Sequence, residues 1–309
     1  MASSKSKQWA GFRSVLCPVD FSAHSRQALR YAQAVAEKSH GAVTVTYAND
    51  PLLVAAAAAA LHDRNVAKRS LKELQTFVDE TLGAGKTGPR LQCRVSVGSP
   101  ADETLKAAAR GRSDLIVLGT HGLTGADRLL LGSTTLSVLQ RANVPVLAVP
   151  RRGYPQDEAP SPSWPGNRIM APIELNDAAS REIETAARLA RWFGSSLLTV
   201  HVVPGITAPH WLRGDLSAHD RIRVAQAQRQ IDALAAIGRR HVPTEGRVTC
   251  GAIADEITAL AASERIELLI AALHDRRGWF GARRGSVSYH VLAYAVAPVL
   301  AYPQSWRPR

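Results

Sequence analysis

Residues 114 to 150 read DLIVLGTHGLTGADRLLLGSTTLSVLQRANVPVLAVP, and this stretch decides the fold. An apolar run at 114–118 is followed by a polar loop with several glycines and then by a segment of helical periodicity. Pro145 ends that segment, because the residue before a proline is disfavoured in the α region. The apolar run that follows returns to an extended conformation. The order strand, glycine-rich loop, helix, strand predicts a parallel sheet.

The glycines of this loop predict a site for an anion. Gly119, Gly122 and Gly132 would let the backbone approach a bound group closely. The helix that follows would offer its first N–H groups to negative charge, with Ser133 as the expected N-cap. The pattern therefore indicates a phosphate site. The alternative is that the glycines only make tight turns between a strand and a helix.

The second half of the chain repeats the first half. VPVLAVP at 144–150 recurs as APVLAYP at 297–303, and Gly-Ser at 132–133 recurs at 285–286. Both pairs are 153 residues apart (303 − 150 and 285 − 132). Solenoid repeats are much shorter, so this period indicates a duplicated domain.

Each half is predicted to be a doubly wound α/β domain with a five-stranded parallel sheet, because strands and helices alternate as βαβαβαβαβ. The Ala-rich region from about 52 to 82 is expected to be helical. The expected boundaries are a flexible basic N-terminal arm at 1–12, a first domain at 13–150, a linker at 151–167, a second domain at 168–303 and a C-terminal tail at 304–309.

Candidate ligand contacts gather where the strands of the first half end. Asp20 follows the first apolar strand, Ala48 and Asn49 the second, Gly98 the third and Gly119 the fourth. In open parallel sheets, ligands bind beyond the carboxyl ends of the strands. The Asp20 carboxylate could accept hydrogen bonds from ribose hydroxyls or from an adenine amine. Its alternative role is to cap the following helix.

Histidine and cysteine indicate no catalytic or metal site. The ten histidines and three cysteines show neither zinc-ligand spacing nor a readable Ser/His/Asp set. His121 lies in the glycine loop, where it could donate to a phosphate or simply be exposed. The cysteines fall in apolar, strand-like runs and are expected to be buried free thiols of a reducing compartment.

The spacing Gly119-x2-Gly122-x9-Gly132-Ser133, followed by Thr135, closely resembles the ATP-binding signature of the universal stress protein family. The resemblance covers nearly the whole chain in two copies, as in tandem members of that family, and implies two adenine nucleotide alpha hydrolase-like domains. It implies that Pro18, Asp20 and Ala48 hold the adenosine end of ATP, that Gly119, Gly122, Gly132 and Ser133 hold the phosphates, and that Thr135 adds a hydroxyl.

The second copy departs from this signature. Glu174, Ala272 and Asp275 replace the aspartate and the first two glycines of the first copy. The methyl group of Ala272 would crowd the backbone and disfavour a positive φ. A carboxylate at Asp275 would repel a phosphate ~4 Å away by about 1 to 4 kcal/mol, unless the arginines at 276, 277, 283 and 284 offset the repulsion. We therefore expect the first domain to bind nucleotide and the second to bind poorly or not at all.

Other nucleotide-binding motifs lack the required context. GAGKT at 83–87 imitates the end of a P-loop, but Glu80 stands where the first glycine should be and a helix precedes it. No GxGxxG follows the first strand, which argues against a dinucleotide-binding domain.

The charge and hydropathy of the chain limit the classes of partner and the cellular location to be expected. The net charge is +12 with a pI of about 10.2, which favours anions in general. The basic residues form no long run and no aromatic platform accompanies them, which argues against nucleic acid. No apolar run reaches the ~20 residues of a membrane span, and no secretory signal is visible at the N-terminus. We expect no membrane partner and a cytoplasmic location.

These features predict an ATP-binding tandem universal stress protein, with Mg²⁺ on the phosphates and a nucleotide-responsive regulatory or stress-protective role. No catalytic base can be identified, so hydrolysis should be slow or absent. The alternatives are a slow ATP hydrolase or adenylate-processing enzyme, and an interaction module that works without nucleotide. The resemblance also implies an internal pseudo-dimer of the two domains, with the strands at 144–149 and 298–302 near the contact. A homodimer is left open.

Overall fold

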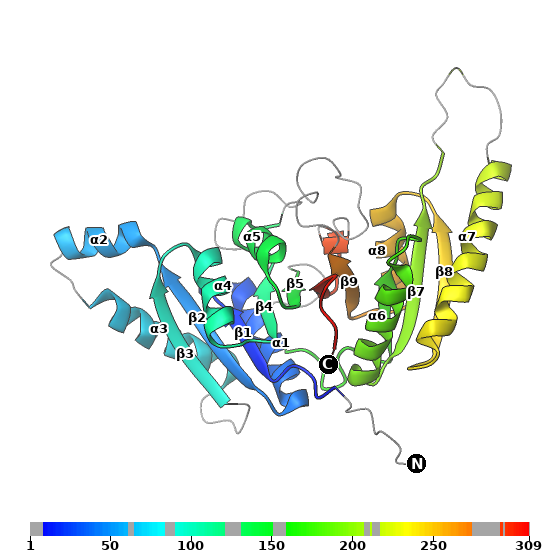
Figure 1. Ribbon diagram of the computed structural model, residues 1–309. Coiled ribbons are helices and arrows are strands. Elements are labelled where there is room, and N and C mark those ends of the chain that lie inside the picture. The colour runs from blue at the N-terminus through cyan, green and yellow to red at the C-terminus, as the bar shows by residue number, and fades with distance from the viewer. Residues whose placement is uncertain are drawn as a thin grey trace, which may run out of the picture. The chain divides into compact units, whose positions relative to one another are not determined.

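The chain forms two α/β units in which strands and helices alternate (Figure 1). The computed structural model describes residues 9–60, 65–83, 90–120, 131–150, 159–206, 211, 217–273, 291, 292 and 294–308. The chain divides into two compact units between Pro162 and Ser163. These units are called the first and the second domain below, and each is described by itself.

The first domain is a five-stranded parallel sheet in the order β3-β2-β1-β4-β5. Helices α1 and α3 contact each other on one face, and α4 and α5 contact each other on the opposite face. The elements are β1 (Ser14–Pro18), α1 (Ala23–Ser39), β2 (Ala42–Asn49), α2 (Pro51–Ala60), α3 (Val66–Leu82), β3 (Arg90–Val97), α4 (Pro100–Arg110), β4 (Leu115–Gly119), α5 (Ser133–Arg141) and β5 (Val146–Val149). This arrangement confirms the predicted doubly wound fold.

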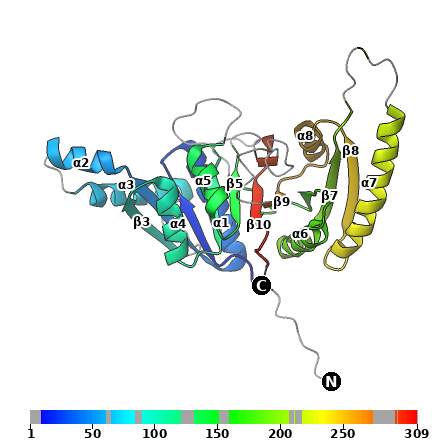
Figure 2. The ribbon, with the colours of Figure 1, turned by 45° about the horizontal axis from the view of Figure 1, so that its top comes forward.

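The second domain has the same arrangement, with the strand order β10-β9-β6-β7-β8. Helix α7 packs along β7 and β8, and α7 lies beside β8 in both views (Figure 1 and Figure 2). The elements are β6 (Arg168–Pro172), α6 (Ala179–Phe193), β7 (Ser196–Val203), α7 (Ser217–Gly238), β8 (Thr244–Cys250), α8 (Ile253–Ser263), β9 (Leu269–Leu273) and β10 (Val299–Pro303).

Strand register shows how the two copies correspond. Ser14 pairs with Ala42 in the first domain, and Arg168 pairs with Ser196 in the second, so the first two strands are 154 residues apart (168 − 14 and 196 − 42). The third strands are 153 apart, because β3 ends at 97 and β8 at 250 (250 − 97). The second domain is therefore one residue shorter between its second and third strands. Glu174 does correspond to Asp20 (174 − 20 = 154).

The sheet cores are apolar along whole strands, not only at alternate positions. Leu115, Ile116 and Val117 of β4 are all fully buried, as expected for a parallel strand with helices on both faces. The Ala-rich region expected as one helical stretch forms two helices, α2 and α3, with Asn65 at the N-cap of α3. Every helix among the described residues falls short of the length and apolarity needed to cross a bilayer.

Candidate functional site

The order of the strands places a switch point at the carboxyl ends of β1 and β4. These two strands pair at the centre of the first sheet, and the chain moves outward from β1 in one direction and from β4 in the other. Pro18 ends β1, Gly119 ends β4, and Asp20 lies two residues beyond β1. Ligands of open α/β sheets bind in the crevice at such a point.

The loop after β1 fixes the orientation of Asp20. The Asp20 Oδ1 atom accepts hydrogen bonds from the Ser22 backbone N at 3.1 Å and from the Ser22 Oγ at 2.5 Å. The Ser22 Oγ in turn accepts from the Ser25 backbone N at 3.2 Å and caps α1. The capping role left open for Asp20 therefore belongs to Ser22, a residue that the sequence reading missed. Asp20 is half-buried, and these hydrogen bonds orient its side chain just beyond the end of β1.

Phe21 gives this loop an unusual backbone. Its φ is 63°, in the left-handed region that residues other than glycine rarely adopt. The ring lies 4.6 Å from Tyr47 at the end of β2 and 5.5 Å from Phe77 in α3, measured between centroids. These aromatic contacts hold a conformation of the kind that often marks functional loops.

The N-terminus of α5 lies beside the end of β4. The Gly132 backbone N donates to the Thr120 carbonyl at 2.8 Å. Gly132 is the N-cap, with φ −56° and ψ 146°, and provides no side-chain hydrogen bond to the helix. The prediction that Ser133 is the N-cap is therefore wrong: Ser133 is the first helical residue, and its side chain is exposed.

Thr135 supports the end of β4. Its Oγ1 atom donates to the Gly119 carbonyl at 2.8 Å, and the residue is only 4% exposed. This bond ties the first turn of α5 to the last residue of the strand. The Thr135 hydroxyl thus has a structural partner, and the ligand contact that the family resemblance implies stays a prediction.

Three helices follow central or outer strands of the first sheet, and their N-termini differ in electrostatics. The first turn of α1 is capped by Ser22, and the first turn of α4 carries Asp102 and Glu103. Helix α5 has neither a capping side chain nor an acidic residue in its first turn. Free N–H groups and the helix dipole favour an anion at such an end. Of these three helices, α5 is therefore best suited to receive one.

Gly119 is closely packed at this site. A Cβ atom at Gly119 would lie 3.1 Å from both the Cβ and the carbonyl oxygen of His24 in α1. Its φ lies outside the left-handed region. The glycine instead lets α1 pack directly against the end of β4. Ala272, the counterpart in the second domain, is buried in β9.

The ends of β2 and β3 complete this edge of the sheet. Ala48 is half-buried, and Asn49 is 1% exposed, with its Oδ1 accepting from the Ser70 Oγ of α3 at 2.8 Å. The Gly98 backbone N donates to the Asn49 carbonyl at 3.0 Å. Gly98 has a φ of 151°, and a Cβ there would lie 3.0 Å from the Glu103 side chain.

Two charged or reactive groups near these strands have shifted pKa values. A hydrogen bond from Lys106 holds the pKa of Glu103 below its ordinary range, so this carboxylate remains charged at neutral pH. Burial strongly raises the pKa of the Cys17 thiol in β1, which makes it a poor nucleophile. Within the described part of the chain, no three His, Cys, Asp or Glu side chains form a possible metal site.

Several predicted residues lie outside the described part of the chain. His121 and Gly122 of the first glycine loop are among them, and so are Asp275 and its neighbouring arginines in the second. Among the described candidates, Pro18, Asp20, Gly119 and Gly132 are brought to the ends of the two central strands. Ala48 and Gly98 lie at the ends of β2 and β3.

Comparison with known proteins identifies the family. The sequence pattern of the universal stress protein family matches residues 11–150 and again residues 166–303. The chain belongs to the universal stress protein family. Its two domains are tandem copies of that family's unit, as the residues of the glycine signature predicted.

Individual relatives agree with this assignment. A universal stress protein of Mycolicibacterium smegmatis is 25% identical over 310 residues, which cover 96% of this chain and 97% of that protein. A universal stress protein of Thermus aquaticus is 34% identical over 140 residues, 45% of this chain and 98% of its own length. The crystal structure of a universal stress protein from Archaeoglobus fulgidus matches the fold with a TM-score of 0.63 at 19% identity, covering 96% of this chain and 98% of that one.

Proposed function

We propose that the first domain binds ATP and that the chain acts as a nucleotide-responsive regulatory or stress-protective protein in the cytoplasm. The N-terminus of α5 carries this proposal. It lies beside the end of β4, one of the two strands at the switch point, and has neither a capping side chain nor an acidic first turn. An anion is the ligand that such a helix end favours.

Each end of the nucleotide has a candidate partner. The phosphates would accept hydrogen bonds from the first backbone N–H groups of α5, at Ser133 and its neighbours. Asp20, whose Oδ1 is fixed by Ser22, would accept hydrogen bonds from the ribose. The backbone at Pro18 and Ala48 would contact the base, and Gly98 would border it. Contacts from His121 and Gly122, and Mg²⁺ carried on the phosphates, remain predictions from the family resemblance.

We propose that the second domain binds nucleotide poorly. Glu174 replaces Asp20 there and is longer by one methylene group. Ala272 replaces Gly119, and Asp275 replaces Gly122 of the phosphate signature. A carboxylate at the position of that glycine would repel an incoming phosphate. A single competent site, in the first domain, is the consequence.

We propose binding without rapid hydrolysis. One oxygen of the Asp20 carboxylate already accepts two hydrogen bonds from Ser22, an arrangement that suits orienting a ribose more than activating water. The alternative, an ATP hydrolase or adenylate-processing enzyme, requires steady phosphate or product release by the purified chain. That release must be lost in Asp20→Ala for the enzyme assignment to hold.

The proposal is tested by two substitutions at one position. Gly132 has φ and ψ values that any residue can adopt, so Gly132→Asp and Gly132→Asn should both fold and both cap α5. Only the aspartate places a negative charge at the proposed phosphate site. A carboxylate ~4 Å from a phosphate costs about 1 to 4 kcal/mol, so we expect Gly132→Asp to weaken ATP binding at least about fivefold more than Gly132→Asn.

Titration calorimetry with ATP and with adenosine would measure this difference. The adenosine affinity should differ little between the two variants, because adenosine lacks phosphates. Equal ATP affinities in the aspartate and asparagine variants would show that the phosphates bind elsewhere. Absence of ATP binding in the unmodified chain would favour a nucleotide-independent interaction module.

A further inference from the structure

The outer strand of the first domain presents a basic face. Strand β3 is at the end of the sheet order, and Arg90, Gln92 and Arg94 occupy alternate positions along it. All three are exposed, and the Arg94 Nη2 donates to the Gln92 Oε1 at 3.1 Å. Alternate residues of a strand share one face, so the two arginines lie on the same side of the sheet.

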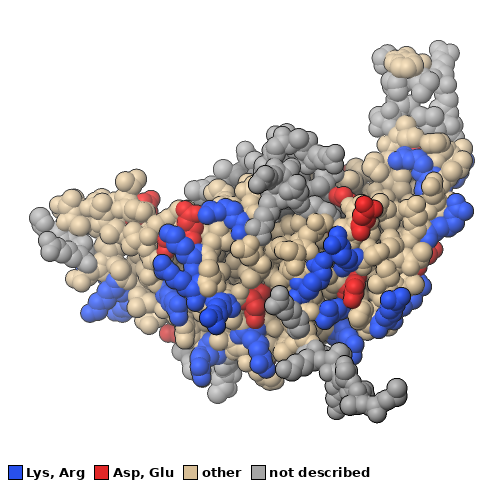
Figure 3. Space-filling model, in the orientation of Figure 1, with Lys and Arg blue, Asp and Glu red and all other residues tan. Residues whose placement is uncertain are grey.

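Helices α4 and α5 extend this basic face. Lys106 and Arg110 are exposed on α4, and Arg141 lies at the end of α5. Among the described residues, two carboxylates share the face: Asp102 bonds Arg141 at 2.6 Å, and Glu103 bonds Lys106 at 2.7 Å. Among the described residues, this face therefore carries five cationic side chains and two carboxylates. Lys and Arg side chains gather over β3 and α4 in the space-filling view (Figure 3).

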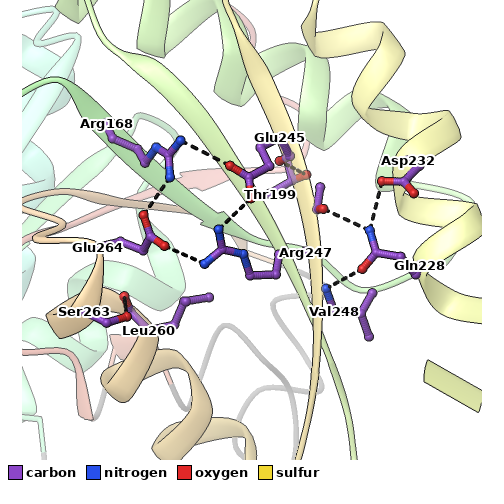
Figure 4. Close-up of polar contacts among 11 residues, drawn as sticks. Arg168, Thr199, Gln228, Asp232, Glu245, Arg247, Val248, Leu260, Ser263 and Glu264 are labelled. Atoms are coloured by element: carbon purple, nitrogen blue, oxygen red, sulfur yellow. Dashed lines mark hydrogen bonds and ion pairs between the residues drawn. The ribbon is translucent and has the colours of Figure 1, made fainter. Parts of the chain in front are cut away.

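On the equivalent face of the second domain, two arginines are paired with two glutamates, so their charges cancel. Arg168 bonds Glu264 at 2.6 Å and Glu245 at 3.1 Å, and Arg247 bonds Glu264 at 2.5 Å and Glu245 at 2.6 Å (Figure 4). Arg247 corresponds to Arg94 (247 − 153), whereas Glu245 corresponds to Gln92 and Glu264 to Gly111. The basic face is therefore a property of the first domain and not of the fold.

The backbone of β3 is also oriented for a partner strand. The Gly98 N–H bonds the Asn49 carbonyl of β2, and N–H groups of alternate residues point to the same side. Leu91, Cys93 and Val95 therefore direct their N–H and C=O groups away from β2, toward the outer edge of the sheet. Such an edge is a template for an added strand.

We propose that β3 receives an extended acidic segment of a partner protein, which adds as a sixth strand. Acidic residues four positions apart in that segment would stand about 13.6 Å apart, two repeats of a strand, and would face Arg90 and Arg94. The backbone of the segment would pair with Leu91, Cys93 and Val95. Pairing of β3 with β3 of a second copy is disfavoured, because it would bring arginines together. A nucleic acid would engage the arginines but would leave the backbone edge unused.

Fluorescence anisotropy with the full chain tests this proposal. The probe is a labelled peptide of alternating Glu and Val. Its control has the central Val and the neighbouring Glu replaced by Pro and one Glu added at its end, which keeps the net charge and removes backbone donors. A labelled oligothymidylate is the third probe. We expect the alternating peptide to bind and the proline peptide to bind at least about fivefold more weakly. Equal binding of the two peptides, or tighter binding of the oligothymidylate, would overturn the proposal.

A pair of double variants locates the site. Arg90→Gln with Arg94→Gln should weaken peptide binding at least about fivefold. Arg229→Gln with Arg240→Gln makes the same charge change at exposed positions of the second domain and should leave binding unchanged. Hydrogen exchange should show new protection at Leu91, Cys93 and Val95 when the peptide binds. Binding without that protection would mean that charge alone attracts the peptide, which would contradict strand addition.

Discussion

At the residue scale, a substitution at Gly119 distinguishes a role in packing from a role in ligand binding. A methyl group at this position would meet His24 backbone and side-chain atoms at 3.1 Å. We therefore expect Gly119→Ala to lower the free energy of unfolding by about 1 to 3 kcal/mol, the usual cost of overpacking. Urea unfolding followed by circular dichroism measures this change, and Ala272→Gly in the second domain is the matched control, with a loss of about 0.5 to 1 kcal/mol.

The two outcomes for Gly119→Ala have different meanings. Reduced stability with an ATP affinity close to that of the unmodified chain would show that the glycine serves mainly the contact between α1 and β4. Unchanged stability with lost ATP binding would contradict the packing explanation and would restore the role in which the backbone approaches the phosphates.

Single residues were only partly predictable. Asp20 was placed beside the switch point from its position after an apolar strand, but Ser22 was missed as the helix cap, although serine before a helix is a common capping signal. Gly132 and Ser133 are both favoured at N-caps, and the sequence did not show which of them begins the helix. The contact between Gly119 and His24 joins residues 95 positions apart (119 − 24), and no local pattern reports it.

At the element scale, the ring of Arg168, Glu245, Arg247 and Glu264 joins the starts of two strands to the end of α8. Hydrogen bonding from Arg247, with Arg168 in addition, holds the pKa of Glu264 below its ordinary value of 4.5. A lowered pKa in the folded state stabilises the protein above the unfolded value and loses that effect as the pH falls through the folded value. The ring should therefore stabilise the second domain at neutral pH, and this stabilisation should decrease as the pH falls below 4.5.

Glu264→Gln tests this pH dependence. Urea unfolding followed by tryptophan fluorescence is suitable, since Trp164 and Trp192 both lie in the second domain. The variant should be less stable than the unmodified chain at pH 7, and the difference should shrink as the pH falls below 4.5. Glu73→Gln, at an exposed position in α3, is the control. A difference that stays constant between pH 7 and pH 3 would mean that the ring does not act through the Glu264 charge.

Helices whose apolar residues recur with the helical period could be predicted from the sequence, and helices without that period could not. The helical spacing of Ala28, Tyr31, Ala32 and Val35 marks the face of α1 that is fully buried. The run of apolar residues in α2 has no period, so the separation of α2 from α3 left no signal in the sequence. Leu52 of α2 is 79% exposed, against the expectation that an apolar helix is buried.

At the scale of the whole molecule, the duplication was visible in the sequence because both copies keep the same strand and loop signatures. The doubly wound fold was predicted from the alternation of strands and helices, whereas the order of the strands came from the structure. The one-residue difference between the second and third strands appeared only in the pairing register. The divergent charges of the two outer strands, basic on β3 and neutral on β8, also required the structure, because Glu264 is distant in sequence from Arg168.

The central claim is one nucleotide site per chain, in the first domain. The most direct measurement is to denature freshly purified protein and to identify and count the released nucleotide, for the unmodified chain and for Gly132→Asp. We predict one ATP per chain in the unmodified protein and none in the variant. Two nucleotides per chain would contradict the argument for a weak second domain, and no nucleotide together with no binding of added ATP would contradict the ATP site itself.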